Sequence, residues 1–399
     1  MPRTHAARNG LLQPSATVAV AQRARELKAQ GIDVLSFSGG EPDFDTPAHI
    51  AAAAKKAIDE GKTRYTAAKG VPELLDAVCA RSKVRRGTDY GRENVVCSVG
   101  AKHVLFNLAL VLYDVGDEVI VPAPYWVSYP EQVRYTGATP VVVETTMADG
   151  FRMTPEQLEA ALTPKTKAVI LCSPSNPTGS AYTEAQLRAL ADVLATHDCW
   201  ILVDEIYGEL VYDGFAQKSV IEVAPELKDR IILIDGVAKT YAMTGWRIGW
   251  MLGPAAVAKD VNKLQGQATT NPTTPAQYAV VEALSGPQDA VAEMLAAFTT
   301  RRSLITHGIN AIEGLSCRMP EGAFYAFTDV SAHVGRKAAG RVLENDIELA
   351  GYLLEEARCA VVPGTAFGAP GHVRISYACS EAQIEEGLRR IAEALGKLE

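Results

Sequence analysis

The middle of the chain alternates short apolar runs, rich in β-branched residues, with longer segments of helical spacing. This alternation predicts an α/β domain built on a mixed, mostly parallel sheet. The runs that predict its seven strands are Val95–Val99, Glu118–Val121, Pro140–Val143, Ala168–Cys172, Trp200–Asp204, Ile231–Asp235 and Arg247–Leu252.

Helical spacing fills several of the segments between these runs. In one segment the apolar positions fall on a single helical stripe, formed by Leu187, Leu190, Ala191 and Leu194. The predicted helices are Ala101–Tyr113, Tyr125–Tyr135, Pro155–Ala161 and Glu184–Thr196.

The connection between the last two predicted strands is unusually short. Only eleven residues, Gly236–Trp246, join them, whereas a parallel crossover usually needs a dozen or more. We therefore expect this pair of strands to be antiparallel, as in many mixed sheets.

The two ends of the chain predict a second, smaller unit. A helical pattern lies near Thr17–Gln30, and residues 300–399 contain a long helix and the runs Ala323–Thr328 and Val373–Tyr377. Neither end makes a domain alone. We expect residues 1–45 to join residues 300–399 in a small α/β domain beside a large domain of residues 46–299.

Composition excludes several classes of protein. Of 399 residues, 48% are hydrophobic and 22% are charged, which excludes a mainly disordered or collagen-like chain. Lys and Arg number 39 against 47 Asp and Glu, giving a net charge of −8. Because sequence-independent nucleic-acid binding depends on basic residues, this balance argues against it.

Other features favour a cytoplasmic protein with no membrane partner. No apolar stretch reaches the roughly 18 residues of a membrane span, and no apolar segment follows the basic N-terminus as in a secretory signal. The seven cysteines are scattered, mostly in apolar runs. This distribution is typical of small core residues in a reducing compartment.

Polar segments follow the ends of five predicted strands. They are Gly100-Ala101-Lys102, Tyr125-Trp126, Ser173–Gly179, Asp204 and Lys239. The carboxyl ends of parallel strands share one edge of a sheet, where ligands bind. The sequence therefore predicts that these segments converge on one crevice.

Two of these residues suggest covalent and electrostatic chemistry. Lys239 follows an apolar strand among aromatic neighbours, and desolvation there favours the neutral amine that attacks carbonyls; the alternative is a solvated loop lysine. Asp204 ends an uncharged run and needs a partner. That partner is either a structural group or a protonated heteroaromatic nitrogen, with Tyr207 spaced to reach the same ring.

The segment Gly100-Ala101-Lys102 predicts an anion site. A helix N-terminus offers free N–H groups and the positive end of the dipole. A lysine in this first turn is unfavourable unless it faces an anion. Arg247, eight residues after Lys239, is placed to add a second positive charge, although a surface ion pair also accounts for it.

Arg374 lies in the alternating apolar run His372–Tyr377. It is either part of a structural ion pair or a guanidinium that binds a substrate carboxylate through two parallel hydrogen bonds. Motifs for other chemistries are missing: no G-x-G-x-x-G opens a helix, and the Walker A, G-x-S-x-G and H-E-x-x-H patterns do not occur. The seven histidines lack metal-ligand spacing, so no metal is expected.

Several longer blocks occur in a fixed order. They are Gly40–Pro47, Pro124–Pro130, Ser173–Gly179, Asp204–Tyr207, Lys239–Arg247 and Pro320–Tyr325. Together they resemble the class I aminotransferases, and most closely the bacterial aspartate aminotransferase subgroup, over roughly residues 12–395. The resemblance implies a fold type I enzyme that uses pyridoxal 5'-phosphate (PLP), and a homodimer with sites at the subunit interface.

The resemblance also implies roles around the cofactor ring. Lys239 is expected to form the Schiff base and Asp204 to pair with the pyridinium nitrogen. Asn176 and Tyr207 are expected to bind the 3-oxygen, and Trp126 to stack on the ring.

Further roles follow for the cofactor phosphate. Arg247 and the helix N-terminus at Gly100, Ala101 and Lys102 are expected to hold it. Tyr65 is expected to reach this phosphate from the other subunit.

The substrate site follows from the same resemblance. Arg374, Asn176 and the Gly40 backbone are expected to bind the substrate α-carboxylate, with Trp126 beside them. Lys102 matches a lysine that binds the side-chain carboxylate in the bacterial subgroup.

The chain departs from its relatives at a few positions. Ala238 precedes the lysine and Gly236 lies three residues before it, so neither supplies a hydroxyl to the phosphate. Gly266 occupies a position where animal-type enzymes have a carboxylate-binding arginine. Ser15 and Thr17 are expected near the entrance.

The expected reaction is ping-pong transamination, through aldimine and ketimine forms, of L-aspartate with 2-oxoglutarate. Alternatives are an aminotransferase for prephenate or aromatic amino acids, and a PLP-dependent C–S lyase. A PLP-sensing regulator is not expected, because the start of the chain has neither the length nor the basic charge of a DNA-binding domain.

Overall fold

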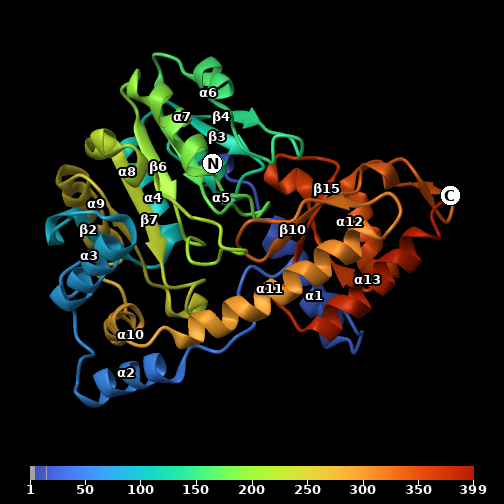
Figure 1. Cartoon of the computed structure of the whole chain (residues 1–399), viewed down its shortest axis with the longest axis horizontal. Coiled ribbons are helices and arrows are strands. Elements are labelled where there is room, and N and C mark those ends of the chain that lie inside the picture. Colours follow the sequence, from blue (N-terminus) through green and yellow to red (C-terminus); the bar gives the residue numbers. More distant parts are fainter. Residues whose placement is uncertain (1–4, 15) are drawn as a thin grey trace.

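The computed structural model describes residues 5–14 and 16–399. Within these residues seven strands form one sheet, in the order β2-β8-β7-β6-β5-β3-β4, and Figure 1 shows helices packed around this sheet. Their bounds are β2 (Val95–Ser98), β3 (Glu118–Ala123), β4 (Thr139–Glu144), β5 (Thr166–Cys172), β6 (Trp200–Asp204), β7 (Ile231–Gly236) and β8 (Gly249–Leu252).

Strand β8 runs antiparallel to both of its neighbours, β2 and β7, and the other adjacent pairs are parallel. This confirms the mixed, mostly parallel sheet and the antiparallel pair expected from the short connection. The last strand begins at Gly249 rather than at Arg247. The reason is that Arg247 has a φ of 57°, a left-handed conformation that an extended strand does not accommodate.

Helices cover both faces of this sheet because successive strand residues point to opposite sides. Ile201 and Val203 join the core on one face, whereas Leu202 joins the core on the other. The first face is covered by α2 (Ala48–Asp59), α3 (Pro72–Arg86), α6 (Pro155–Ala161), α7 (Glu184–Ala195), α8 (Val220–Val223) and α10 (Thr274–Ser285). The second is covered by α4 (Ala101–Leu112), α5 (Ser128–Tyr135) and α9 (Ala255–Ala268).

Helix α5 begins three residues later than the sequence pattern predicts. The backbone N–H of Tyr125 donates a hydrogen bond of 3.0 Å to the carbonyl oxygen of Phe367. This long-range contact holds the segment before Ser128 outside the helix.

The C-terminal part contains a second sheet in the order β14-β15-β10-β9, with antiparallel neighbours. Its bounds are β9 (Ser316–Cys317), β10 (Tyr325–Asp329), β14 (Val362–Pro363) and β15 (His372–Ser376), with α11 (Asp289–Asn310), α12 (Asp346–Glu356) and α13 (Glu381–Leu395) around it. Two short hairpin strands, β11 (Lys337–Ala338) and β12 (Arg341–Val342), complete this region.

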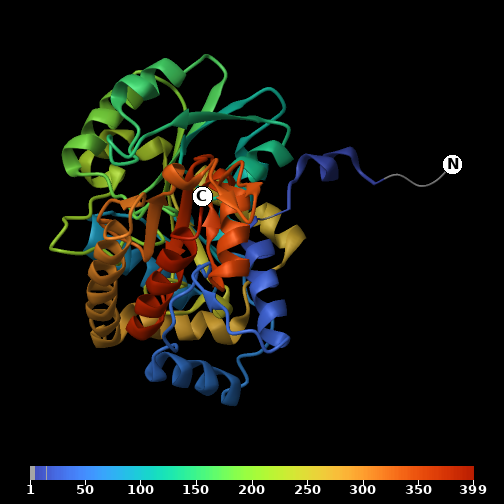
Figure 2. The same cartoon turned by 90° about the vertical axis from the view of Figure 1, so that its right-hand side faces the viewer.

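The N-terminal residues lie beside this C-terminal part. Strand β1 (Leu35–Ser36) pairs in parallel with β13 (Cys359–Ala360), and α1 (Ala16–Ala29) contacts the same region (Figure 2). Helix α11 runs without a break across residue 299 (Figure 1). The division into residues 1–45, 46–299 and 300–399 stays a prediction.

None of the helices in residues 5–14 and 16–399 combines the length and the apolar character needed to cross a membrane.

Candidate active site

The strand ends that carry the predicted site residues meet at one edge of the large sheet. Register places Gly249, the first residue of β8, beside both Ser98 at the end of β2 and Gly236 at the end of β7. Asp204 ends β6 beside Ile234 of β7. The loops that follow β2, β6 and β7 and the turn before β8 therefore gather at this edge.

Lys239 lies in the loop after β7, with its amine turned toward the N-terminal segment. Nζ donates a hydrogen bond to the carbonyl oxygen of Gly40 and lies 5.9 Å from the ring centroids of both Tyr207 and Phe324. Burial lowers the pKa of Lys239 to about 8, while the negative charge of Glu41 acts in the opposite direction. A substantial fraction of this amine is thus neutral near physiological pH.

Asp204 is buried, with 3% of its surface exposed. Its Oδ2 accepts a hydrogen bond of 2.7 Å from the Tyr129 hydroxyl, and its Oδ1 accepts one of 3.2 Å from the Ile206 N–H. Burial raises the pKa of Asp204 to about 6, and these two hydrogen bonds oppose that rise. A cationic group beside it would stabilise the carboxylate.

Tyr129 is a further candidate site residue, to which the sequence patterns assign no role. Its ring packs edge-on against Trp126, with 5.4 Å between ring centroids, so it connects Trp126 to Asp204. The available signal was its position three residues after Trp126 in a predicted helix, a spacing that places both on one face.

Arg374 lies on β15, with 2% of its surface exposed. Its Nη1 donates to Oδ1 of Asn176 at 2.9 Å, and its Nη2 donates to the carbonyl oxygen of Ser38 at 2.8 Å. Its Nε is buried and has no hydrogen-bond partner in the part of the chain that the structure describes. A buried guanidinium with an open donor suits a carboxylate ligand.

Gly100 and Arg247 form a compact anion cradle at the start of α4. Gly100 precedes the helix with a φ of 85°, and a Cβ placed on it would lie 2.6 Å from Nη2 of Arg247. Arg247 is held by a hydrogen bond of 2.8 Å from its Nη1 to the Thr244 carbonyl. The first free N–H groups of α4, at Ala101 and Lys102, face the same end of the helix.

Lys102 contributes a second positive charge at this edge. Its Nζ lies 4.8 Å from the ring centroid of Trp126. Burial, followed by the charge of Arg247, lowers the pKa of Lys102. Lys102 and Arg247 are therefore close enough to repel each other, which an anionic ligand would relieve.

The remaining predicted residues are Tyr65, Thr17 and Ser15. Tyr65 is 88% exposed, and within the described residues its side chain makes no hydrogen bond to the other predicted site residues. Thr17 lies in α1, and its role stays a prediction. Ser15 falls outside the residues that the structure describes.

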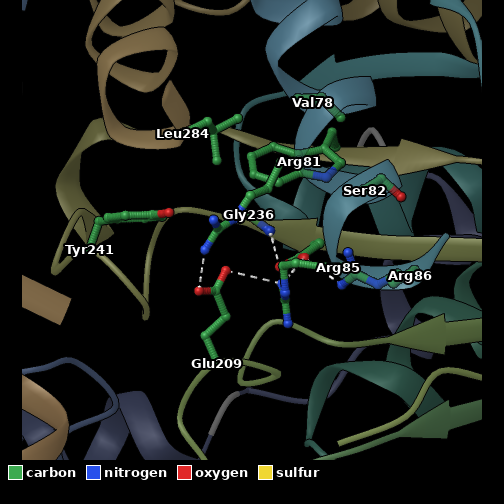
Figure 3. Close-up of a pocket in the computed structure, with 11 residues that line it drawn as sticks. Val78, Arg81, Ser82, Arg85, Arg86, Glu209, Gly236, Tyr241 and Leu284 are labelled. Atoms are coloured by element: carbon green, nitrogen blue, oxygen red, sulfur yellow. Dashed lines mark hydrogen bonds and ion pairs between the residues drawn. The ribbon is translucent and has the colours of Figure 1, made fainter. Parts of the chain in front are cut away.

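A separate pocket contains none of the predicted site residues (Figure 3). Three arginines of α3 line it, and they belong to a network of ion pairs with Glu205, Glu209 and Asp235. Arg86 binds Glu205 and lies 2.7 Å from Oδ2 of Asp235, while Arg85 reaches Asp235 at 3.3 Å and Glu209 at 3.1 Å. Glu205 follows Asp204, so this network fixes the end of β6 from the other side.

Comparisons with known proteins agree with this geometry. The family model for aminotransferases of class I and II matches residues 32–391. An aspartate/prephenate aminotransferase of Cereibacter sphaeroides is 48% identical over 95% of this chain and 96% of its own. An aspartate aminotransferase of Geobacillus stearothermophilus is 47% identical over the same shares.

Solved structures give the same result. The aspartate aminotransferase from Rhizobium meliloti superposes with a TM-score of 0.96, at 44% identity and covering 100% of both chains. The Thermus thermophilus aspartate aminotransferase with maleate gives 0.93, at 42% identity over 98% of this chain and 100% of that one. By sequence and by fold, the chain belongs to the class I and II aminotransferases.

Proposed function

We propose that this aminotransferase uses pyridoxal 5'-phosphate and transfers the amino group of L-aspartate to 2-oxoglutarate. The observation that carries the proposal is one pair of residues at the same edge of the sheet. Lys239 offers an amine with a pKa of about 8. Asp204 offers a buried carboxyl group whose ionised form a neighbouring positive charge would stabilise. A PLP site needs both.

The donor groups fit this cofactor. The cradle at Gly100 and Arg247 suits its phosphate, and the Asp204 carboxylate suits a protonated ring nitrogen. Trp126, held by Tyr129, offers an aromatic face for the ring.

Asn176 and Tyr207 offer polar atoms for the cofactor's 3-oxygen. Lys239 is the residue proposed to hold the cofactor covalently. When bound, the cofactor supplies an electron sink for the charge left on the substrate Cα after loss of its proton.

Two residues then act on protons. Once the substrate amino group has displaced it from the cofactor, Nζ of Lys239 would be a free neutral amine. It would accept the proton lost from the substrate Cα and then donate it, acting as a general base followed by a general acid. The Asp204 carboxylate keeps the proton on the ring nitrogen, since an adjacent anion favours the charged form of that nitrogen.

The same geometry supports a dicarboxylic substrate. Arg374, with Asn176 and the Gly40 backbone, is the proposed site for the α-carboxylate. Lys102, whose amine lies beside Trp126, is the proposed partner of the second carboxylate. The names of the relatives support aspartate, and one of them also includes prephenate.

We also propose a cytoplasmic homodimer with shared sites and the domain division given above. The exposed aromatic ring of Tyr65 supports a contact with the partner's site. All seven cysteines, each within the described ranges, are free thiols, which supports a reducing compartment.

Borohydride reduction of the purified protein, followed by peptide mass spectrometry, tests the covalent step. A pyridoxyl adduct on the peptide that contains Lys239 is expected, and its absence would contradict the proposal. A coupled assay with 2-oxoglutarate over a panel of amino donors, and with prephenate as an acceptor, then ranks the substrates. Pyruvate release from cystathionine without a keto acid would instead identify a C–S lyase.

A further inference from the structure

Tyr325 lies between two residues of the proposed site and has no role in the function derived so far. It is the first residue of β10 and has 0% of its surface exposed. Its hydroxyl oxygen lies 2.8 Å from that of Tyr207, and the Cζ of Arg374 lies 4.5 Å from its ring centroid. One side chain thus contacts both the proposed carboxylate site and a proposed ligand of the cofactor's 3-oxygen.

The direction of the hydrogen bond between the two tyrosines follows from proton counting. Each hydroxyl carries one proton, and among the described residues the Tyr325 hydroxyl bonds to Tyr207 alone. If Tyr207 uses its proton for the cofactor's 3-oxygen, Tyr325 must donate to the Tyr207 oxygen. That donation polarises the Tyr207 hydroxyl and strengthens it as a donor.

Burial keeps both hydroxyls protonated, although the positive charge of Arg374 acts to lower the pKa of each. Burial raises the pKa of Tyr207 and of Tyr325. The titratable groups that face the pair are Arg374, Lys239 and the buried thiol of Cys172, whose pKa burial also raises. Near neutral pH the pair can therefore act only through its hydrogen bonds.

We propose that Tyr325 is a positioning residue with two separable effects. Its hydroxyl directs the Tyr207 proton toward the cofactor's 3-oxygen, and its ring supports the Arg374 guanidinium that receives the substrate α-carboxylate. This inference rests on the proposed function and deepens it, because it gives one buried side chain control over both binding events.

The Tyr325→Phe variant of the holoenzyme separates these effects. A weaker donor at Tyr207 leaves more negative charge on the 3-oxygen, which holds the proton on the lysine–cofactor nitrogen more tightly. The pH midpoint of the visible absorption band is therefore expected to rise by about 0.3–0.6 unit. Maleate, a dicarboxylate, serves as the probe of the carboxylate site at Arg374. Its dissociation constant, measured at a pH well below that midpoint, is expected to change less than about two-fold.

Removing the ring tests the second effect. Tyr325→Leu is expected to weaken maleate binding by about 5- to 30-fold, because the guanidinium loses its aromatic support. Tyr377→Phe is the matched control. That tyrosine is also fully buried, but its hydroxyl donates to the Ala323 carbonyl at 3.1 Å, so neither the midpoint nor maleate binding should change.

A double variant makes the test decisive. In a Tyr207→Phe background, Tyr325→Phe should add no further shift of the midpoint, because its effect passes through Tyr207. Two results would overturn the inference. One is that Tyr325→Phe shifts the pH midpoint as much in the Tyr207→Phe background as in the wild type. The other is that the single Tyr325→Phe variant, like Tyr377→Phe, leaves the midpoint unchanged. A wild-type holoenzyme with neither the visible band nor an adduct on Lys239 would instead overturn the proposed function.

Discussion

The Tyr129 hydroxyl lies 2.7 Å from Oδ2 of Asp204 and donates a hydrogen bond to it. Burial alone drives this carboxyl toward its neutral form, and the Tyr129 hydrogen bond acts against that. The ionised form is the one that can hold a protonated ring nitrogen. Tyr129, on α5, therefore supports a charge that lies at the end of β6.

Tyr129→Phe should weaken cofactor binding and lower kcat/KM by roughly ten- to a hundred-fold, because a hydrogen bond to a charged group contributes about 1.5–3 kcal/mol. Loss of this bond raises the pKa of Asp204, so the acidic limb of the binding profile should move to higher pH. Cofactor dissociation constants measured from pH 5 to 8 check both points. Tyr113→Phe is the control, because its buried hydroxyl has no hydrogen-bond partner within the described segments.

Asp204→Asn should stabilise the cofactor-free protein while impairing cofactor binding. The folded-state pKa of Asp204 rises from 3.8 to about 6, so the folded state binds more protons than the unfolded state between these values. Wild-type stability from this group therefore falls as pH rises through that window, by roughly 3 kcal/mol at most. Urea unfolding should show the advantage of the Asn variant growing from pH 4 to 6 and then staying constant. An advantage that is equal at pH 4 and pH 8 would contradict this account.

Lys102→Ala should reduce the preference for a dicarboxylic substrate. A charge-assisted hydrogen bond contributes about 1.5–3 kcal/mol, so kcat/KM for aspartate should fall by ten-fold or more relative to that for phenylalanine. The ratio of the two constants, measured on wild type and variant, checks this. An unchanged ratio would remove Lys102 from substrate recognition.

Arg86→Leu should destabilise the fold by about 3–5 kcal/mol, because it leaves the buried carboxylates of Glu205 and Asp235 without their main counter-charge. Arg92→Leu provides the matched control. Arg92 pairs with Asp76 on the surface, and an exposed pair of this kind contributes little to stability. Urea unfolding of both variants should separate the two effects, and equal losses would contradict the buried-network interpretation.

The strands could be predicted because their signal is local. The uncharged run Trp200–Val203 followed by Asp204 predicts β6 with its observed bounds. The short connection after β7 predicts the reversal of β8 for a purely geometric reason. Since the strand ends carry the polar segments, their gathering at one edge followed from topology alone.

The remaining details depend on contacts between distant segments. The surrounding sequence does not indicate the left-handed conformation of Arg247. Nor does it indicate the backbone hydrogen bond between Tyr125 and Phe367. In the sequence, Tyr129 and Tyr325 resemble ordinary core aromatic residues. Only the fold places Tyr129 beside Asp204 and Tyr325 beside Arg374. The role proposed for Tyr65 involves a second subunit, which no pattern within one chain describes.

The reversed strand β8 has a consequence for how the enzyme can vary. Because the chain turns back at once instead of crossing the sheet, Lys239 and Arg247 lie on the two arms of a single hairpin-like return. Their separation in space is set by the length of that return, which contains one short 3₁₀-helix, Thr244–Trp246, and no crossover α-helix. Inserting or deleting even one residue there would displace the Lys239 amine relative to Arg247 and Gly100, so this segment should tolerate substitution far better than a change in length.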